Sequence, residues 1–191
     1  MNLNLSGLVA LWLPILLSAV VVFVISSLIH MVFKWHASDY KGFANEDAVR
    51  DALRGSNPET GKQYVVPYCT DMKEMGSEVM QKKYATGPNA VVVFGPNGQP
   101  KMGKQLGLWF LWALIVALAA GFIVAELIMI HPWRARAAAK LVGAVTFVAY
   151  GFGTVTESIW MYRSWASSAK YLLDAALYAV GSALVFYYLW P

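Results

Sequence analysis

The sequence predicts an all-α membrane protein with four transmembrane helices and a small α+β extramembrane domain between the first two. Three observations predict this fold: an apolar composition, a clustering of charge, and four long apolar runs. Of the 191 residues, 58% are apolar and 14% are charged, whereas a soluble domain is about 25% charged. The composition therefore excludes a disordered chain and a disulfide scaffold.

Most of the charge lies in one segment. Ten of the 15 Lys and Arg, and eight of the 11 Asp and Glu, fall between Lys34 and Lys104. The net charge of this segment is 10 minus 8, or +2, which is too small to indicate a polyanionic partner. We therefore expect no nucleic acid to bind.

Four apolar runs exceed the roughly 20 residues needed to cross the hydrocarbon core. They place the transmembrane helices at 7–33, 105–130, 138–162 and 171–190, and the extramembrane domain at 34–104. The first run is too long for a signal peptide core, so we expect a retained anchor. Pro14 predicts a kink in it.

The basic residues beside the runs predict the orientation. Six flank the membrane on the side of the 34–104 domain: Lys34, Lys41, Lys101, Lys104, Arg163 and Lys170. Three lie on the other side: Arg134, Arg136 and Lys140. Because Lys and Arg gather on the cytoplasmic side, we expect the 34–104 domain to be cytoplasmic.

The extramembrane segment carries the signals of a small folded domain. Asn45 is a suitable cap for a helix over 46–54, and a second helix is expected over 77–84. The β-branched runs at 64–66 and 90–94 predict two short strands. Because so short a segment holds little core, we expect it to pack on the helices or on a partner.

One motif in this segment resembles a phosphate-binding loop. Residues 98–104 match the first seven positions of G-x-x-x-x-G-K. However, Gln105 stands where the magnesium-binding hydroxyl belongs, and Pro100 lacks a backbone N–H donor. We therefore expect no bound nucleotide.

The remaining three carboxylates, Glu126, Glu157 and Asp174, lie within the predicted helices, where an ionisable group is costly. Helical spacing and depth define a candidate intramembrane polar layer of His30, Tyr150, Thr154, Glu157, Asp174 and Tyr178. Two interpretations stay open. The layer is a proton-relay, metal or headgroup site, or it consists of structural pairs with Arg163, Lys170 and tyrosines.

The histidines near the first helix end do not indicate a metal pair. His30 and His36 are six residues apart, whereas helical ligand pairs are spaced by three or four. We therefore expect His36 to be solvated at the interface. No metal, other cofactor or catalytic residue is predicted.

Small residues form a seam on the second predicted helix: Ala113, Ala117, Gly121 and Ala125. Such seams allow close helix packing. The spacing does not distinguish packing within the chain from packing against a partner.

Several short stretches resemble an uncharacterised family of four-span bacterial inner-membrane proteins. They are residues 26–32, Trp35-His36, Asp39-Tyr40, 102–104, 108–111, 158–160, 163–165 and 189–191. The resemblance implies four spans and a bacterial inner membrane, and it implies no activity.

The leading hypothesis is an accessory, scaffold or assembly subunit of a larger membrane complex, without catalytic activity. Its partners would be the lipid bilayer and other membrane-protein subunits, or a second copy of the chain. The alternative is a small oligomeric membrane enzyme or transporter that uses His30, Glu157 and Asp174.

Overall fold

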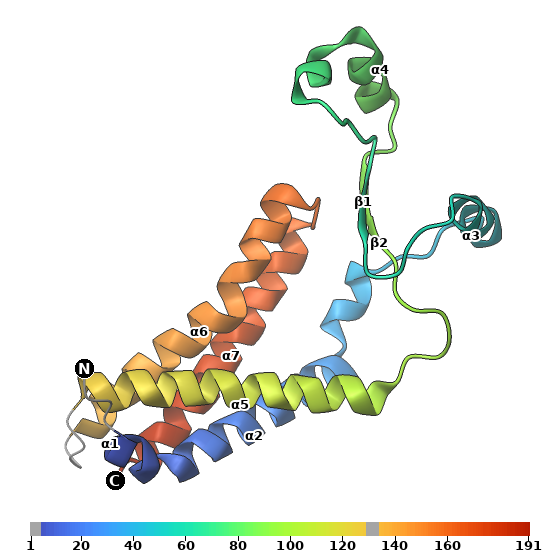
Figure 1. Ribbon diagram of the computed structural model, residues 1–191. Coiled ribbons are helices and arrows are strands. Elements are labelled where there is room, and N and C mark those ends of the chain that lie inside the picture. The colour runs from blue at the N-terminus through green and yellow to red at the C-terminus, as the bar shows by residue number, and fades with distance from the viewer. Residues whose placement is uncertain (1–4, 129–133) are drawn as a thin grey trace.

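The computed structural model describes residues 5–128 and 134–191, and helices account for most of them (Figure 1). Four helical segments are long and apolar enough to cross a membrane. They are α2 (Trp12–Ser27) continued by the π-helical turn Leu28–Phe33, α5 (Met102–Leu127), α6 (Ala135–Trp160) and α7 (Trp165–Tyr188). The described residues thus contain the four predicted long apolar helices; the predicted end at residue 130 lies outside them.

The first predicted helix is broken near its beginning. Helix α1 (Leu5–Ala10) ends at a turn at Leu11, and α2 follows. Proline cannot donate to the carbonyl four residues earlier, and its ring crowds that carbonyl. For Pro14 this residue is Ala10, so the break lies where the ring requires it.

Small residues let α6 and α7 pack closely as an antiparallel pair. A Cβ atom on Gly151 would lie 3.1 Å from Leu172 and 3.2 Å from Ala175. At the other end, a Cβ on Gly143 would lie 3.4 Å from the Ala183 Cβ. Glycine therefore sets the separation of these two helices.

The small-residue seam of α5 packs inside the chain. Its four members, Ala113, Ala117, Gly121 and Ala125, are all buried. Gly121 faces Ile15 of α2, and a Cβ there would lie 2.7 Å from the Ile15 Cγ1 and Cδ1 atoms. The seam therefore contacts this chain's own helices, which the sequence spacing alone did not show.

The outer faces of the four segments are apolar. In their most apolar windows only 33% to 39% of the residues are buried. Large side chains such as Val24, Ile115 and Val180 are about half exposed, at 50%, 47% and 58%. These exposed apolar faces suggest a multi-pass membrane protein.

The predicted elements of the extramembrane segment are present. Helix α3 (Glu46–Gly55) begins at Asn45, whose side chain accepts a hydrogen bond from the Ala48 N–H at 3.2 Å. Strands β1 (Gln63–Val66) and β2 (Ala90–Val93) pair antiparallel, with Gln63 opposite Val93. Helix α4 (Glu78–Thr86) lies between the strands in sequence.

These elements form an extended arm and not a compact domain. In residues 40–101, all of which the structure describes, Met80 is the single buried residue. Figure 1 shows α3 and α4 at separate ends of the strand pair, away from the four long helices. Gln63 donates a hydrogen bond to the sulfur of Met161, the residue that follows α6, at 3.3 Å. We call residues 40–101 the arm.

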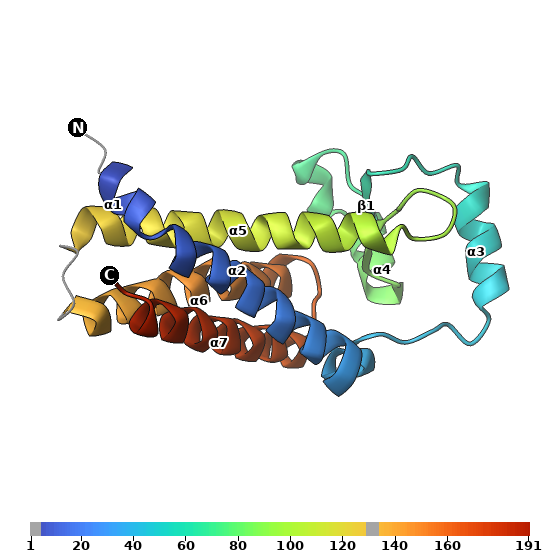
Figure 2. The same cartoon turned by 90° about the horizontal axis from the view of Figure 1, so that it is seen from below.

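The arm and the chain's C-terminus lie at opposite ends of the four long helices. Figure 2 shows α1 and the C-terminus at one end and the arm at the other. Figure 1 shows that the pair α6 and α7 lies close to the pair α2 and α5 near the C-terminus, and that the two pairs separate at the end that carries the arm. This end of the molecule carries the candidate site.

Substitution of Gly181 tests the packing of α7 on α2. A Cβ there would lie 2.8 Å from both Ile25 Cδ1 and Val21 Cγ1, and the β-branched valine has little rotamer freedom. We expect Gly181→Ala to lower the free energy of unfolding by about 1–3 kcal/mol. Gly153 is the matched control, since nothing lies within 4 Å of the position that a Cβ would occupy there. Thermal unfolding in detergent should show no loss for Gly153→Ala, and equal losses for both variants would contradict this packing.

Candidate functional site

The chain reverses direction directly after the first long helical segment. The last turn, Leu28–Phe33, is π-helical, and Lys34 then adopts a left-handed conformation with φ 52° and ψ 28°. A 3-10 turn, Trp35–Asp39, follows. Local departures of this kind from α-helix are frequent at functional sites. Here they return the chain to the side of α7.

The reversal places His36 between two carboxylates. Its Nε2 atom lies 2.7 Å from Asp174 Oδ2, and its Nδ1 atom lies 2.9 Å from Asp39 Oδ2. Trp35 donates from Nε1 to the other Asp174 oxygen at 3.1 Å. His36 is 5% exposed and Asp174 is 2% exposed. The contact between them is therefore buried, and Trp35 and Asp39 hold it from either side.

Lys170 of α7 fixes the turn from the other side. Its ammonium group donates to the Trp35 carbonyl at 2.9 Å, to Ser38 Oγ at 2.7 Å and to Asp39 Oδ1 at 2.5 Å. Ser167 Oγ donates to Asp39 Oδ2 at 3.1 Å. The hydrogen bonds from Lys170 and then His36 lower the pKa of Asp39 to about 2. Asp39 is therefore an anion at neutral pH.

Lys170 is not the partner of the buried Asp174. Lys170 pairs with Asp39, which leaves the buried Asp174 beside His36. A carboxylate is an acceptor only, so each ring nitrogen facing one must donate a proton or bind a cation. His36 Nε2 and Asp174 Oδ2 therefore share a hydrogen bond, or both bind one cation.

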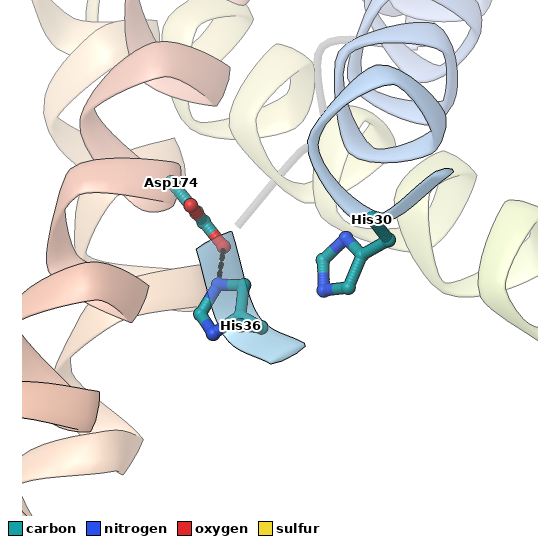
Figure 3. A group of neighbouring side chains, drawn as sticks. All are labelled: His30, His36 and Asp174. Atoms are coloured by element: carbon teal, nitrogen blue, oxygen red, sulfur yellow. Dashed lines mark hydrogen bonds and ion pairs between the residues drawn. The ribbon is translucent and has the colours of Figure 1, made fainter. Parts of the chain in front are cut away.

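His30 completes the cluster from the end of the first long segment. Its ring is nearly parallel to that of His36, at an interplanar angle of 8° and a centroid separation of 5.1 Å. Figure 3 shows the nitrogen-bearing edge of His30 facing His36 and Asp174. One donor atom from each of the three residues lies within 4.8 Å of the others. His30, His36 and Asp174 are hereafter called the His-His-Asp cluster.

A cavity of about 600 Å³ opens beside the cluster, between α2, α5, α6 and α7. His30 and Asp174 line it together with Trp109, Tyr150 and Tyr178. Two buried polar atoms of this lining, Trp109 Nε1 and Tyr150 Oη, have no hydrogen-bond partner in the part of the chain that the structure describes. The site therefore combines a mostly apolar wall with polar groups available to a ligand.

The structure brings together part of the predicted polar layer. Tyr150 and Tyr178 contact each other edge to face, with ring centroids 5.2 Å apart, and both line the cavity with His30 and Asp174. Thr154 lies apart from it, in the contact between α6 and α7, where its hydroxyl is 2.8 Å from that of Ser168.

Glu157 does not belong to the layer. It is exposed and pairs with Arg163, with Oε2 2.6 Å from Nε. The structural interpretation expected the layer to pair with Arg163, Lys170 and tyrosines; Arg163 does pair with Glu157, whereas Lys170 binds Asp39, which lies outside the predicted layer. Asp174 alone of the two predicted carboxylates is thus part of the cluster.

The interpretation of His36 as a solvated side chain was wrong. It rested on the position of His36 just beyond the predicted helix end at residue 33, and the argument against a metal pair applied a helical spacing across that end. The left-handed Lys34 ends the helix and turns His36 inward. A signal was present in the sequence: His36 and Asp39 are three residues apart, and neither was included in the predicted layer.

Comparisons with protein-family models, curated proteins and solved structures find no match to this chain. The resemblance to four-span bacterial membrane proteins therefore stays a prediction. Functional conclusions for this chain rest on its own geometry.

Truncation of Asp174 tests the buried group. Asp174→Ala leaves the Trp35 N–H and the His36 ring without their shared acceptor, and removing one partner of a buried pair costs about 3–5 kcal/mol. Glu157→Ala is the matched control, because its pair with Arg163 is partly exposed and should be worth about 0–1 kcal/mol. Thermal unfolding of both variants in detergent measures the difference. Losses of equal size would show that Asp174 and its partners do not form a buried group.

Proposed function

We propose that this chain is an accessory, scaffold or assembly subunit of a larger membrane protein complex, without catalytic activity of its own. The observation that carries the proposal is the arm, which exposes many apolar side chains and buries a single residue, Met80, within residues 40–101. Large exposed apolar surfaces are typical of contact sites for other proteins.

The arm's exposed apolar side chains come from several of its elements. They are Tyr40, Phe43, Val65, Val66, Tyr68, Met72, Met75, Val79 and Val93, each at least 43% exposed. A two-stranded sheet is only marginally stable in water by itself. A partner that covered these side chains would therefore also stabilise the arm.

The strongest candidate contact on the arm is a groove of about 540 Å³ beside α4. Val66, Pro67 and Val79 supply apolar walls, and Lys82 and Lys83 supply positive charge. This combination favours a partner segment with apolar side chains flanked by acidic ones. The two strands also each have an unpaired edge in their two-stranded sheet, to which an extended segment could add.

The four apolar helices support a location in a bilayer, and the six-to-three distribution of flanking Lys and Arg supports a cytoplasmic arm. With the resemblance described above, we propose the bacterial inner membrane. The partner would then be another membrane-protein subunit or a cytoplasmic domain attached to one. Self-association through the same arm is an outcome that the experiment below detects.

A small oligomeric membrane enzyme or transporter is the second candidate, and the cavity beside Asp174 favours it. Its residues differ from those first expected, because Glu157 pairs with Arg163 at a distance from the cluster. His36 would take the place of Glu157 beside His30 and Asp174.

Photocrosslinking in the native membrane tests the leading proposal. A photoreactive amino acid at Val79 or Val93, both 65% exposed, should give a discrete product with another membrane protein, identified by mass spectrometry. The control position is Asp47 in α3, whose side chain is 92% exposed and polar. Products no more abundant at Val79 and Val93 than at Asp47 would contradict the proposal, and a product with a second copy would identify self-association.

A further inference from the structure

We propose that His30, His36 and Asp174 are the ligands of a divalent transition-metal ion at the arm end of the cavity. This goes beyond the proposed scaffold function and does not depend on it. Two imidazoles and one carboxylate form a ligand set that zinc and other first-row ions bind. All three residues are within the part of the chain that the structure describes, and they come from the first long segment, the turn after it, and α7.

The donor atoms are near the separation that such an ion needs. They lie within 4.8 Å of one another. Metal–ligand bonds of 2.0–2.2 Å in a tetrahedral site put donors about 3.4 Å apart. His36 Nε2 and Asp174 Oδ2 are 2.7 Å apart, so these two atoms would separate slightly to admit the ion. The exposed His30 side chain would shift and turn toward them, and Figure 3 shows its nitrogen-bearing edge already facing the pair.

Both histidines have the outer partners that metal-binding histidines need. A ligating imidazole nearly always donates its other ring N–H to a carboxylate or a backbone carbonyl. His36 Nδ1 is 2.9 Å from Asp39 Oδ2, and His30 Nδ1 is 2.9 Å from the Ser26 carbonyl. Because a carbonyl oxygen only accepts, His30 carries its proton on Nδ1, which leaves the Nε2 lone pair available.

Charge and access also favour an ion. Asp174 is buried and its partner is the His36 ring, because Lys170 is paired with Asp39. A divalent cation between His36 and Asp174 would displace the proton that these two side chains share. His30 and Asp174 open onto the cavity of about 600 Å³. Three protein ligands and an open side leave a fourth position for water or an exchangeable ligand, as in reactive zinc sites.

Zinc titration of the full chain tests the proposal. The protein is purified in detergent with a tag that contains no histidine, treated with a chelator, titrated with Zn²⁺ and passed through a desalting column. Metal analysis should find one ion per chain. Binding should also raise the midpoint of thermal unfolding, because the ion binds the folded state.

His30→Ala is the decisive variant. His30 is exposed, so the metal-free variant should unfold at the temperature of the metal-free wild type. Its affinity for zinc should fall by more than the 10- to 100-fold that loss of an outer partner causes. Asp39→Asn should lower affinity by about 10- to 100-fold while one ion per chain still binds at saturation.

Glu157→Gln is the matched control, since this carboxylate lies outside the cluster and pairs with Arg163; its zinc affinity should equal that of the wild type. Absence of zinc binding by the wild type would overturn the proposal. So would equal affinity for wild type and His30→Ala, which would mean adventitious binding elsewhere.

Discussion

The contact between His36 and Asp174, at 2.7 Å, is the interaction on which this end of the molecule depends. It joins the turn after the first long segment to the middle of the last helix, 138 residues later in the chain. A buried carboxylate is stable only with a partner of opposite charge or with hydrogen bonds that replace water. Asp174 therefore requires His36 as its partner. Lys170 holds the same turn through hydrogen bonds to the Trp35 carbonyl and the Asp39 carboxylate.

This turn also sets the position from which the arm starts. Because residues 35–39 are fixed against α7, the arm starts beside α7 at this end of the helices, and its return joins α5 at Met102. The arm has no comparable buried contacts of its own. The scaffold proposal and the metal proposal thus concern two adjacent parts of one end of the molecule, an exposed apolar arm and a buried polar cluster.

The secondary-structure elements of the fold were predictable where they depend on local sequence signals. The four long helices follow from apolar runs, and α3 from Asn45 and the acidic residues after it. The site was predicted only in part: Asp174, His30 and the two tyrosines were identified by helical spacing. His36 and Asp39 were not, because a left-handed Lys34 has no signature such as Gly or Asn, which usually occupy that conformation. The open form of the arm was also missed, since strand and helix signals do not show whether the elements share a core.

A double-mutant cycle on His36 and Asp174 tests this account most directly. The free energy of unfolding of the full chain in detergent is measured for the wild type, His36→Ala, Asp174→Ala and the double variant. If the two side chains bind each other directly or through a shared ion, the sum of the two single losses should exceed the double loss by about 1–3 kcal/mol. Losses that add to within about 0.5 kcal/mol would show that the two residues act independently, and would contradict the account.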